Sequence, residues 1–472
     1  MKRFLVSLLV LSMLMLCFAS CGGDDKDTGN GGIKDDEEGQ YLDNVDFEGY
    51  VFRFLGGAMD GGILYDEDEM DSSSLMDQAV IQRDSEIMER FNITFDQNIL
   101  TENYIGNFIL KDALNPASSY DFARLHGTES AAEIIAQKSA ADIKELPIID
   151  LTQPWYQSQA NDEYTIMGRQ YLIAGMYPGI NGTPPLVFNK SMISEINMPL
   201  PYDLILSGNW TLEEMLKYTS AAYSPDFNGD GNQDHLDRYG YSGHSRSIPY
   251  FYQGMGGLTT SRDVNGAIVP VLSDEKTDML YDKIKEFWDS QANWINDQNN
   301  DGYPEGGHNV FRAGKSLFCY YVTVVTKYYE IESFEYGLAI LPKYNLDQDR
   351  YYCPGGGSIV LFPANLEDEY TTGYLYEALN EASYRITYPA NIQEAVDFEM
   401  LTDEKSIEVQ KLIDQSLSFD ILKNFDPTNG GLSSCAFFYM CLEDDIPPSV
   451  YAGMYRDAYE QLFEDFFYGV KN

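Results

Sequence analysis

The chain has 472 residues, with 31 Lys and Arg against 75 Asp and Glu, and a formal net charge of −44 at pH 7. A field this negative repels nucleic acid and anionic lipid, which excludes proteins that bind either one through a basic surface. About 430 residues remain after the N-terminal segments described next, too many for one ordinary hydrophobic core, so two lobes are expected.

The N-terminus predicts export and lipid attachment. Lys2 and Arg3 precede a short apolar run that ends at Phe18, and Ala19-Ser20-Cys21 follows. These are features of a secretory signal, and the run is too short for a membrane span. The last residues resemble the bacterial lipobox, although Phe18 stands where Leu is usual. The resemblance implies a signal peptide over 1–20 and a lipidated Cys21, with an uncleaved anchor or secretion without lipid as alternatives.

Residues 21–40 predict a disordered tether. Gly, Asp, Asn, Lys and Glu dominate this segment, and Ile33 is its only large apolar residue. Such a segment cannot bury enough surface to offset the entropy lost on ordering. As a Gly-rich coil it would reach about 25 Å, and the folded body would begin near Tyr41.

The body opens with alternating strands and helices. Apolar and aromatic runs predict strands over 50–55, 93–95 and 120–125, and helical spacing predicts a helix over 74–91. This alternation indicates an α/β fold with a mainly parallel sheet and crossover helices.

Later segments carry further signals. Thr211 and Glu214 form a capping box that predicts a helix start, and the apolar face over 450–470 predicts a helix near the end of the chain. The run over 358–362 predicts another strand. We assign Trp155 and Trp210 to structural packing.

Several short stretches occur in an order shared with a known family. They lie at 79–85, 91–93, 153–156, 186–190, 209–214, 312–318, 336–337, 341–344 and 377–379. Together they cover nearly the whole body. Their order resembles the family 1 extracellular solute-binding lipoproteins, the maltose-binding-protein-like subunits of ABC importers.

This resemblance implies a two-lobe periplasmic-binding-protein type II fold that closes over a ligand. The crossing strands would lie near 177–190 and 355–363, where Gly355-Gly356-Gly357 suits either a hinge or a plain turn. Lobe 1 would comprise 41–180 plus 360–425, and lobe 2 would comprise 181–358 plus 426–472.

Residues 226–237 match the spacing of a calcium-binding loop. Gly231 occupies the sixth position, where such a loop turns sharply, and position twelve is Asp rather than the usual Glu, as in dockerin loops. The prediction is a structural Ca²⁺, and the alternative is an acidic surface turn. The expected ligands are Asp226, Asn228, Asp230, Asn232 through its carbonyl, Asp234 and Asp237.

A second stretch, 297–308, begins in the same way but favours a turn. Pro304 interrupts it, and position twelve is His308, a poor calcium ligand. Whether it binds metal stays open at this point.

Signatures of enzymes are weak. Gly314-Lys315-Ser316 looks like the end of a P-loop, but the Gly required five residues earlier is Asn309. The four His residues lack metalloprotease spacing, no Gly-x-Ser-x-Gly occurs, and nothing singles out a catalytic pair of acids. We therefore expect a protein that is not an enzyme.

Sugar recognition needs aromatic faces for the pyranose rings and planar polar groups for the hydroxyls. The family places stacking aromatics at points similar to two clusters here, and the facing lobe would add polar groups near the first crossing. A packing role is the alternative for each residue. The candidates are Tyr250, Phe251, Tyr320, Tyr321, His126 and Asn181.

These observations predict an anchored, extracytoplasmic binding protein that captures a solute, a carbohydrate by resemblance, and delivers it to an ABC permease. We expect a monomer that contacts the membrane through its lipid alone. The alternatives are a secreted glycoside hydrolase and a surface adhesion protein that uses its dockerin-like loop.

Four cysteines of the body leave the redox state open. Export permits disulfides, and three pairings of Cys319, Cys353, Cys435 and Cys441 can be drawn. Free buried thiols are the alternative.

Overall fold

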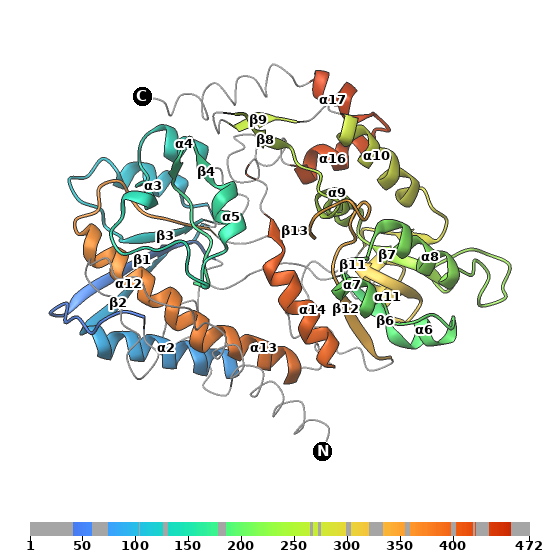
Figure 1. Cartoon of the computed structure of the whole chain (residues 1–472), viewed down its shortest axis with the longest axis horizontal. Coiled ribbons are helices and arrows are strands. Elements are labelled where there is room, and N and C mark those ends of the chain that lie inside the picture. Colours follow the sequence, from blue (N-terminus) through green and yellow to red (C-terminus); the bar gives the residue numbers. More distant parts are fainter. Residues whose placement is uncertain are drawn as a thin grey trace.

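The computed structural model describes residues 41–58, 74–102, 104–125, 131–177, 186–264, 268–271, 275–298, 304–320, 334–354, 359–397, 403–418, 421 and 434–454. They form two lobes that lie side by side (Figure 1). The expected signal peptide, tether and lipidated Cys21 lie outside these residues.

Lobe 1 is built on a four-stranded sheet in the order β14-β3-β1-β2. Strand β1 pairs in parallel with both β2 and β3, and β14 pairs antiparallel with β3. The expectation of a mainly parallel sheet is therefore confirmed for this lobe, as are its predicted strands. The strands are β1 (Tyr50–Gly56), β2 (Ile93–Ile99), β3 (Phe122–Leu125) and β14 (Ile359–Leu361).

Successive side chains of a strand point to opposite sides of the sheet. Both faces of this sheet are covered. Phe54 of β1 contacts Phe122 of β3 at 5.2 Å between ring centroids on one face, whereas Leu55 and Ala123 belong to the core on the other. The lobe's helical elements are α2 (Leu75–Phe91), α3 (Gly106–Asp112), α4 (Ala132–Ala136), η1 (Ile143–Glu145), α5 (Ser158–Glu163), α12 (Glu369–Ala382), the π-helical η3 (Ser383–Thr387) and α13 (Tyr388–Asp397). A short hairpin joins β4 (Thr165–Ile166) to β5 (Arg169–Gln170).

Lobe 2 is built on a five-stranded sheet in the order β10-β7-β11-β6-β12. Its β10, β7 and β11 are parallel, whereas β6 is antiparallel to both β11 and β12. The mainly parallel expectation therefore holds for only half of this sheet. The strands are β6 (Leu186–Asn189), β7 (Tyr239–Gly243), β10 (Asn293–Ile295), β11 (Ser316–Tyr320) and β12 (Tyr336–Ala339).

The helices of lobe 2 include the one predicted from its capping box. Thr211 Oγ1 accepts a hydrogen bond from the Glu214 backbone N–H at 3.3 Å, so α8 begins where the sequence predicts. Of the helix expected over 450–470, only α17 falls within the described residues. The helical elements are α6 (Lys190–Glu195), α7 (Tyr202–Leu206), α8 (Leu212–Ala222), η2 (Ser245–Ser247), α9 (Ile248–Gly254), α10 (Glu275–Trp288), α11 (Gly307–Arg312), α14 (Glu404–Gln415), α16 (Ser434–Glu443) and α17 (Pro448–Met454).

Within the described residues, three passages between the lobes can be followed. The chain leaves lobe 1 after 177 and enters lobe 2 at β6, returns from β13 (Cys353–Pro354) to β14, and passes again between α13 and α14. The first two passages agree with the expected crossings, although 178–185 and Gly355-Gly356-Gly357 lie outside the described residues.

The third passage comes earlier than the expected boundary at 425. Helix α14 packs against α7 and β12 of lobe 2. Lys190 forms an ion pair with Asp403 at its start, and the hydroxyls of Tyr202 and Ser406 lie 2.9 Å apart. Residues 404–418 therefore pack with lobe 2. The sequence could not show this, because an apolar helix face indicates that a helix is buried but not which sheet it covers.

Three of the four cysteines of the body are free and buried: Cys319, Cys353 and Cys441. Burial raises the pKa of the Cys441 thiol to about 12, so it stays protonated at neutral pH. The side chain of Cys435 lies outside the described part of the structure. Among the described residues, no helix combines the length and apolar character needed to cross a bilayer.

Candidate functional site

A cavity of about 300 Å³ lies where the two lobes meet. Lobe 1 contributes Glu163 at the end of α5, and lobe 2 contributes Gln253 of α9, the segment 257–262 and Ile268. Ile421 completes the lining. The volume is at the lower end of the range for small-molecule sites, and a position between two lobes is a common place for them.

Two glycines shape the wall that lobe 2 contributes. Gly256 has φ of 76°, a left-handed conformation that turns the chain at the end of α9. A Cβ on Gly257 would lie 2.4 Å from Cε2 of Tyr252, so only glycine allows the backbone to pass this ring. The ring itself is held by stacking on Phe438 at 4.3 Å. The chain can then lead directly into the hairpin of β8 (Thr260–Arg262) and β9 (Ile268–Pro270).

The polar groups around the cavity are held by hydrogen bonds. Gln253 is almost fully buried, and its Nε2 donates to the Ser418 carbonyl at 3.0 Å. Arg262 Nη2 donates to the carbonyl oxygens of Asp162 at 3.1 Å and Glu163 at 2.8 Å. Partial removal from water lowers the pKa of Arg262, but a guanidinium remains charged at any physiological pH. The cavity thus offers an amide, a carboxylate and a cation.

The predicted aromatic cluster is assembled, but its members differ in exposure. The rings of Tyr250 and Tyr320 are stacked, with centroids 5.2 Å apart and an interplanar angle of 20°. Tyr250 is partly exposed, whereas Tyr320 is fully buried. A contact between Tyr250 and a ligand remains a proposal.

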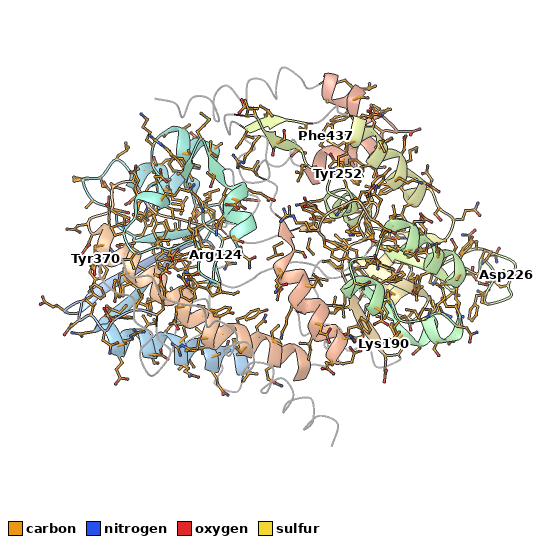
Figure 2. The ribbon with its side chains drawn as sticks, viewed as in Figure 1. Arg124, Lys190, Asp226, Tyr252, Tyr370 and Phe437 are labelled. Carbon is orange, nitrogen blue, oxygen red and sulfur yellow. The ribbon has the colours of Figure 1, made fainter. Side chains whose placement is uncertain are left out.

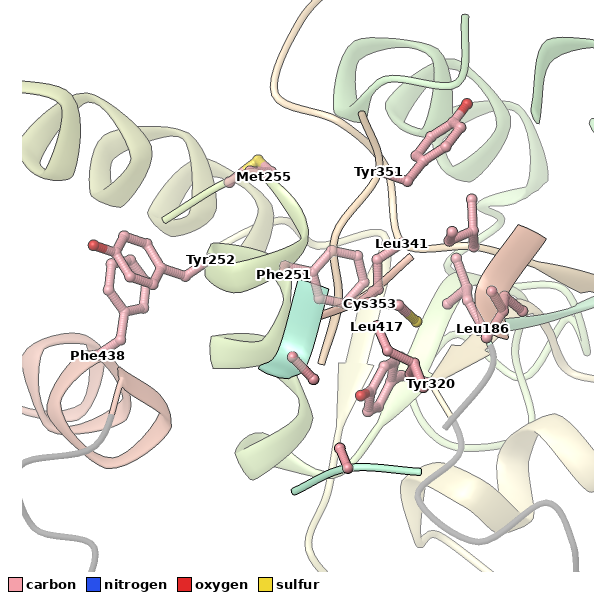
Figure 3. Close-up of a cluster of buried hydrophobic side chains, with 14 of the residues drawn as sticks. Leu186, Phe251, Tyr252, Met255, Tyr320, Leu341, Tyr351, Cys353, Leu417 and Phe438 are labelled. Carbon is pink, nitrogen blue, oxygen red and sulfur yellow. The ribbon is translucent and has the colours of Figure 1, made fainter. Parts of the chain in front are cut away.

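Phe251 has a packing role in this structure. Its ring is fully buried and contacts Tyr241 at 5.8 Å and Phe287 at 5.1 Å. Figure 3 shows it with Tyr320 in the apolar cluster of lobe 2. A ring without an exposed face cannot stack on a ligand in this conformation, because its surface is already covered by other side chains.

The remaining predicted contacts, His126, Asn181 and Tyr321, lie outside the described residues. Sequence reasoning missed Glu163 and Arg262, which come from opposite lobes and meet only when the lobes do. It also missed Gln253, although this residue follows the aromatic run 250–252 on the same helix and precedes the glycines that the turn requires. That adjacency is the one signal that could have indicated it.

The expected calcium loop forms a hydrogen-bonded turn at the outer end of lobe 2, where Figure 2 labels Asp226. Asp226 Oδ1 accepts from the Gly231 N–H at 2.9 Å, and Asp237 accepts from the N–H groups of Phe227 at 2.7 Å and Asp234 at 2.9 Å. Asp237 is fully buried beneath the loop. These bonds keep the loop compact through backbone donors.

In the described part of the chain, no group of three or more His, Cys, Asp or Glu side chains is arranged to hold a metal ion. The six expected ligands are Asp226, Asn228, Asp230, Asn232, Asp234 and Asp237. Calcium binding by these residues stays a prediction.

The second acidic stretch, 297–308, begins at a hydrogen-bonded aspartate. Asp297 accepts hydrogen bonds from the Ser245 N–H and hydroxyl, each at 2.7 Å. Burial lowers the pKa of His308 to about 4, so this residue is neutral at physiological pH. Residues 299–303 lie outside the described part.

Comparison with solved structures supports the two-lobe fold. The chain is similar to a cyclo/maltodextrin-binding protein complexed with maltotetraose, with a TM-score of 0.57, 14% identity, and coverage of 89% of this chain and 98% of that one. It is also similar to the galacto-N-biose-/lacto-N-biose I-binding protein of an ABC transporter from Bifidobacterium longum, in complex with lacto-N-biose, with a TM-score of 0.57, 11% identity, and coverage of 89% and 98%.

A third similar structure binds a different kind of ligand. UgpB from Mycobacterium tuberculosis, in complex with glycerophosphocholine, has a TM-score of 0.54, 13% identity, and coverage of 87% and 98%. No protein-family profile matches the chain. No curated protein matches its sequence either. At these identities the likeness establishes the type II periplasmic-binding fold.

Proposed function

We propose that this protein is an extracytoplasmic solute-binding lipoprotein that captures a sugar or oligosaccharide and delivers it to an ABC permease. The cavity between the lobes carries this proposal, because it is where such a fold encloses a ligand. Its amide, carboxylate and guanidinium can bond to hydroxyl groups, and the partly exposed Tyr250 lies on the helix that supplies Gln253. The sugars in two of the similar structures favour a carbohydrate.

Isothermal titration calorimetry with a panel of mono-, di- and tetrasaccharides tests this function. Glycerophosphocholine belongs in the same panel, because one similar protein binds it. We expect one carbohydrate class to bind and to be recovered intact by chromatography. Binding of glycerophosphocholine alone would replace the proposed ligand, and cleavage of the sugar would favour a secreted glycoside hydrolase.

Tyr250 and Phe251 form a matched pair for locating the ligand. An aromatic ring that stacks on a sugar contributes on the order of 1 kcal/mol beyond its burial, so Tyr250→Ala should weaken binding by about tenfold and leave the melting temperature nearly unchanged. Phe251→Ala removes a buried ring and should instead lower stability by about 3–5 kcal/mol. Normal affinity in Tyr250→Ala would remove this residue from the site.

Membrane attachment through Cys21 belongs to the same proposal. A lipid on this residue followed by the 21–40 tether would hold the two-lobe body near the permease while leaving it free to bind ligand. Cys21→Ala should release the protein from membranes without changing its melting temperature. Retention of the variant in the membrane fraction would contradict the lipobox assignment.

A further inference from the structure

A side chain of the β8–β9 hairpin of lobe 2 contacts lobe 1. Arg262, at the end of β8, donates from Nη2 to the carbonyl oxygens of Asp162 and Glu163. These two carbonyls are at the C-terminal end of α5, where the C-cap N–H of Tyr164 also reaches the Asp162 carbonyl. A guanidinium suits this position because the partial charge at a helix C-terminus is negative.

Helix α5 is in turn fixed to the segment that leaves lobe 1. Asn161, buried within α5, donates from Nδ2 to the Ala174 carbonyl at 2.9 Å, and its Oδ1 accepts from the Ala174 N–H at 2.9 Å. Ala174 is three residues before Tyr177, after which the chain passes into lobe 2. A reciprocal pair of hydrogen bonds therefore links α5 to the first passage between the lobes.

A second contact reinforces the first. Glu163 Oε1 accepts from the Ser418 hydroxyl at 3.3 Å and lies 4.0 Å from Nη2 of Arg350. The guanidinium of Arg350 lies over the ring of Tyr352 at 4.4 Å. Ser418 and Arg350 both belong to the part of the chain that packs with lobe 2, so two arginines of lobe 2 act on the same end of one lobe 1 helix.

The third passage joins the lobes between α13 and α14, below the cavity in the view of Figure 1. There Tyr388 of α13 donates to Asp414 of α14 at 2.7 Å. The contacts at the end of α5 lie near the first passage, through Asn161 and Ala174, and near the end of α14, because Ser418 follows Gln415 by three residues. They therefore join the lobes close to where the chain passes between them.

We infer that Arg262 is a latch between the lobes, a positioning residue that favours the closed conformation even without ligand. It acts by capping α5 across the cavity, with Glu163 and Arg350 in support. As far as it concerns ligand affinity, the inference rests on the proposed function. A latch that already favours closure lowers the free energy that the ligand must supply to close the lobes.

Fluorescence energy transfer between the lobes tests the latch without ligand. Azidophenylalanine at Leu114 in lobe 1 and Leu346 in lobe 2, both exposed, can carry the dyes in the full chain. We expect a population with short interlobe distance in the ligand-free protein, and we expect Arg262→Ala to reduce it. Arg262→Lys keeps the charge on a shorter side chain with a single nitrogen, so its effect should be intermediate.

Arg238→Ala is the matched control, because Arg238 forms an ion pair with Glu195 inside lobe 2. It should leave the interlobe distances unchanged. For a sugar found by calorimetry, Arg262→Ala should raise Kd about fivefold, which corresponds to about 1 kcal/mol, mainly through faster dissociation. Equal distances in the wild type and Arg262→Ala, or an equal shift in Arg238→Ala, would overturn the latch. If no ligand binds, the proposed function is contradicted. The interlobe distances still decide whether Arg262 is a latch.

Discussion

Each lobe contains a buried tryptophan whose indole N–H is satisfied in a different way. In lobe 2, Trp210 donates to the Ile340 backbone carbonyl at 2.9 Å, and its ring contacts Tyr218 and Phe318 at 5.8 Å each. In lobe 1, Trp155 donates to the carboxyl group of Glu377 at 3.1 Å. A backbone carbonyl does not titrate, whereas a carboxyl group does, so the two cores should respond differently to pH.

The surroundings of Glu377 make that difference large. This fully buried carboxyl group also accepts from the Tyr156 hydroxyl at 2.5 Å and from the Asp150 N–H at 3.4 Å. Burial raises its pKa to about 7, although these donors act in the opposite direction. The polar network of lobe 1 is therefore within reach of physiological pH, and the corresponding site in lobe 2 is not.

The largest effect should come from the tryptophan of lobe 2. Trp210→Ala removes a fully buried ring and should lower the free energy of unfolding by about 3–5 kcal/mol, equally at pH 5 and pH 8. Urea denaturation followed by circular dichroism measures this.

Trp155→Ala is the counterpart in lobe 1. It should lower the free energy of unfolding more at pH 8 than at pH 5, because Glu377 is ionised at pH 8 and has lost one of its donors. Equal losses for Trp155→Ala at both pH values would remove the contrast between the lobes.

Glu377→Gln sharpens the comparison. Because the pKa of Glu377 in the folded protein is above its ordinary 4.5, the folded state binds a proton that the unfolded state has released between pH 4.5 and 7. The stability contributed by Glu377 is thus complete below pH 4.5 and is lost as pH rises through 7, about 3 kcal/mol in all. In Glu377→Gln this slope should disappear. Urea midpoints measured at intervals of half a pH unit follow it, and an unchanged slope would assign the pH dependence to other groups.

Calcium should have the smallest effect on stability. It would reverse the comparison, because the stability of lobe 2 would then depend on an ion in solution. If residues 226–237 bind Ca²⁺, 1 mM metal should stabilise the protein by about 1.4 kcal/mol for a Kd near 0.1 mM. Asp230→Ala should abolish the gain, because it removes one expected ligand. Thermal melts in calcium and in chelator compare the two proteins. Identical curves for the wild type would leave the loop as a turn.

Local patterns predicted much of each lobe separately. The strand at 50–55 and the helix at 74–91 follow from alternation and helical spacing, and Thr211 caps its helix through the hydroxyl that the motif requires. These features depend on residues a few positions apart.

Features that depend on both lobes could not be predicted in this way. The apolar face of α14 predicts burial but not the sheet it covers, and the aromatic run 250–252 does not reveal that Phe251 points into the core while Tyr250 stays partly exposed. Glu163 and Arg262 are two charged residues among many in the sequence. They become a site only because the fold brings the end of α5 to the β8–β9 hairpin.

The sequence by itself determined the elements, the α/β character and the order of segments that resembles solute-binding lipoproteins, because these follow from the chemistry of neighbouring residues. The tertiary structure decided which aromatics are core, how Trp155 and Trp210 are satisfied, and which groups surround the cavity. Those outcomes depend on contacts between residues distant in the chain, whose partners are selected by the packing of whole helices and sheets.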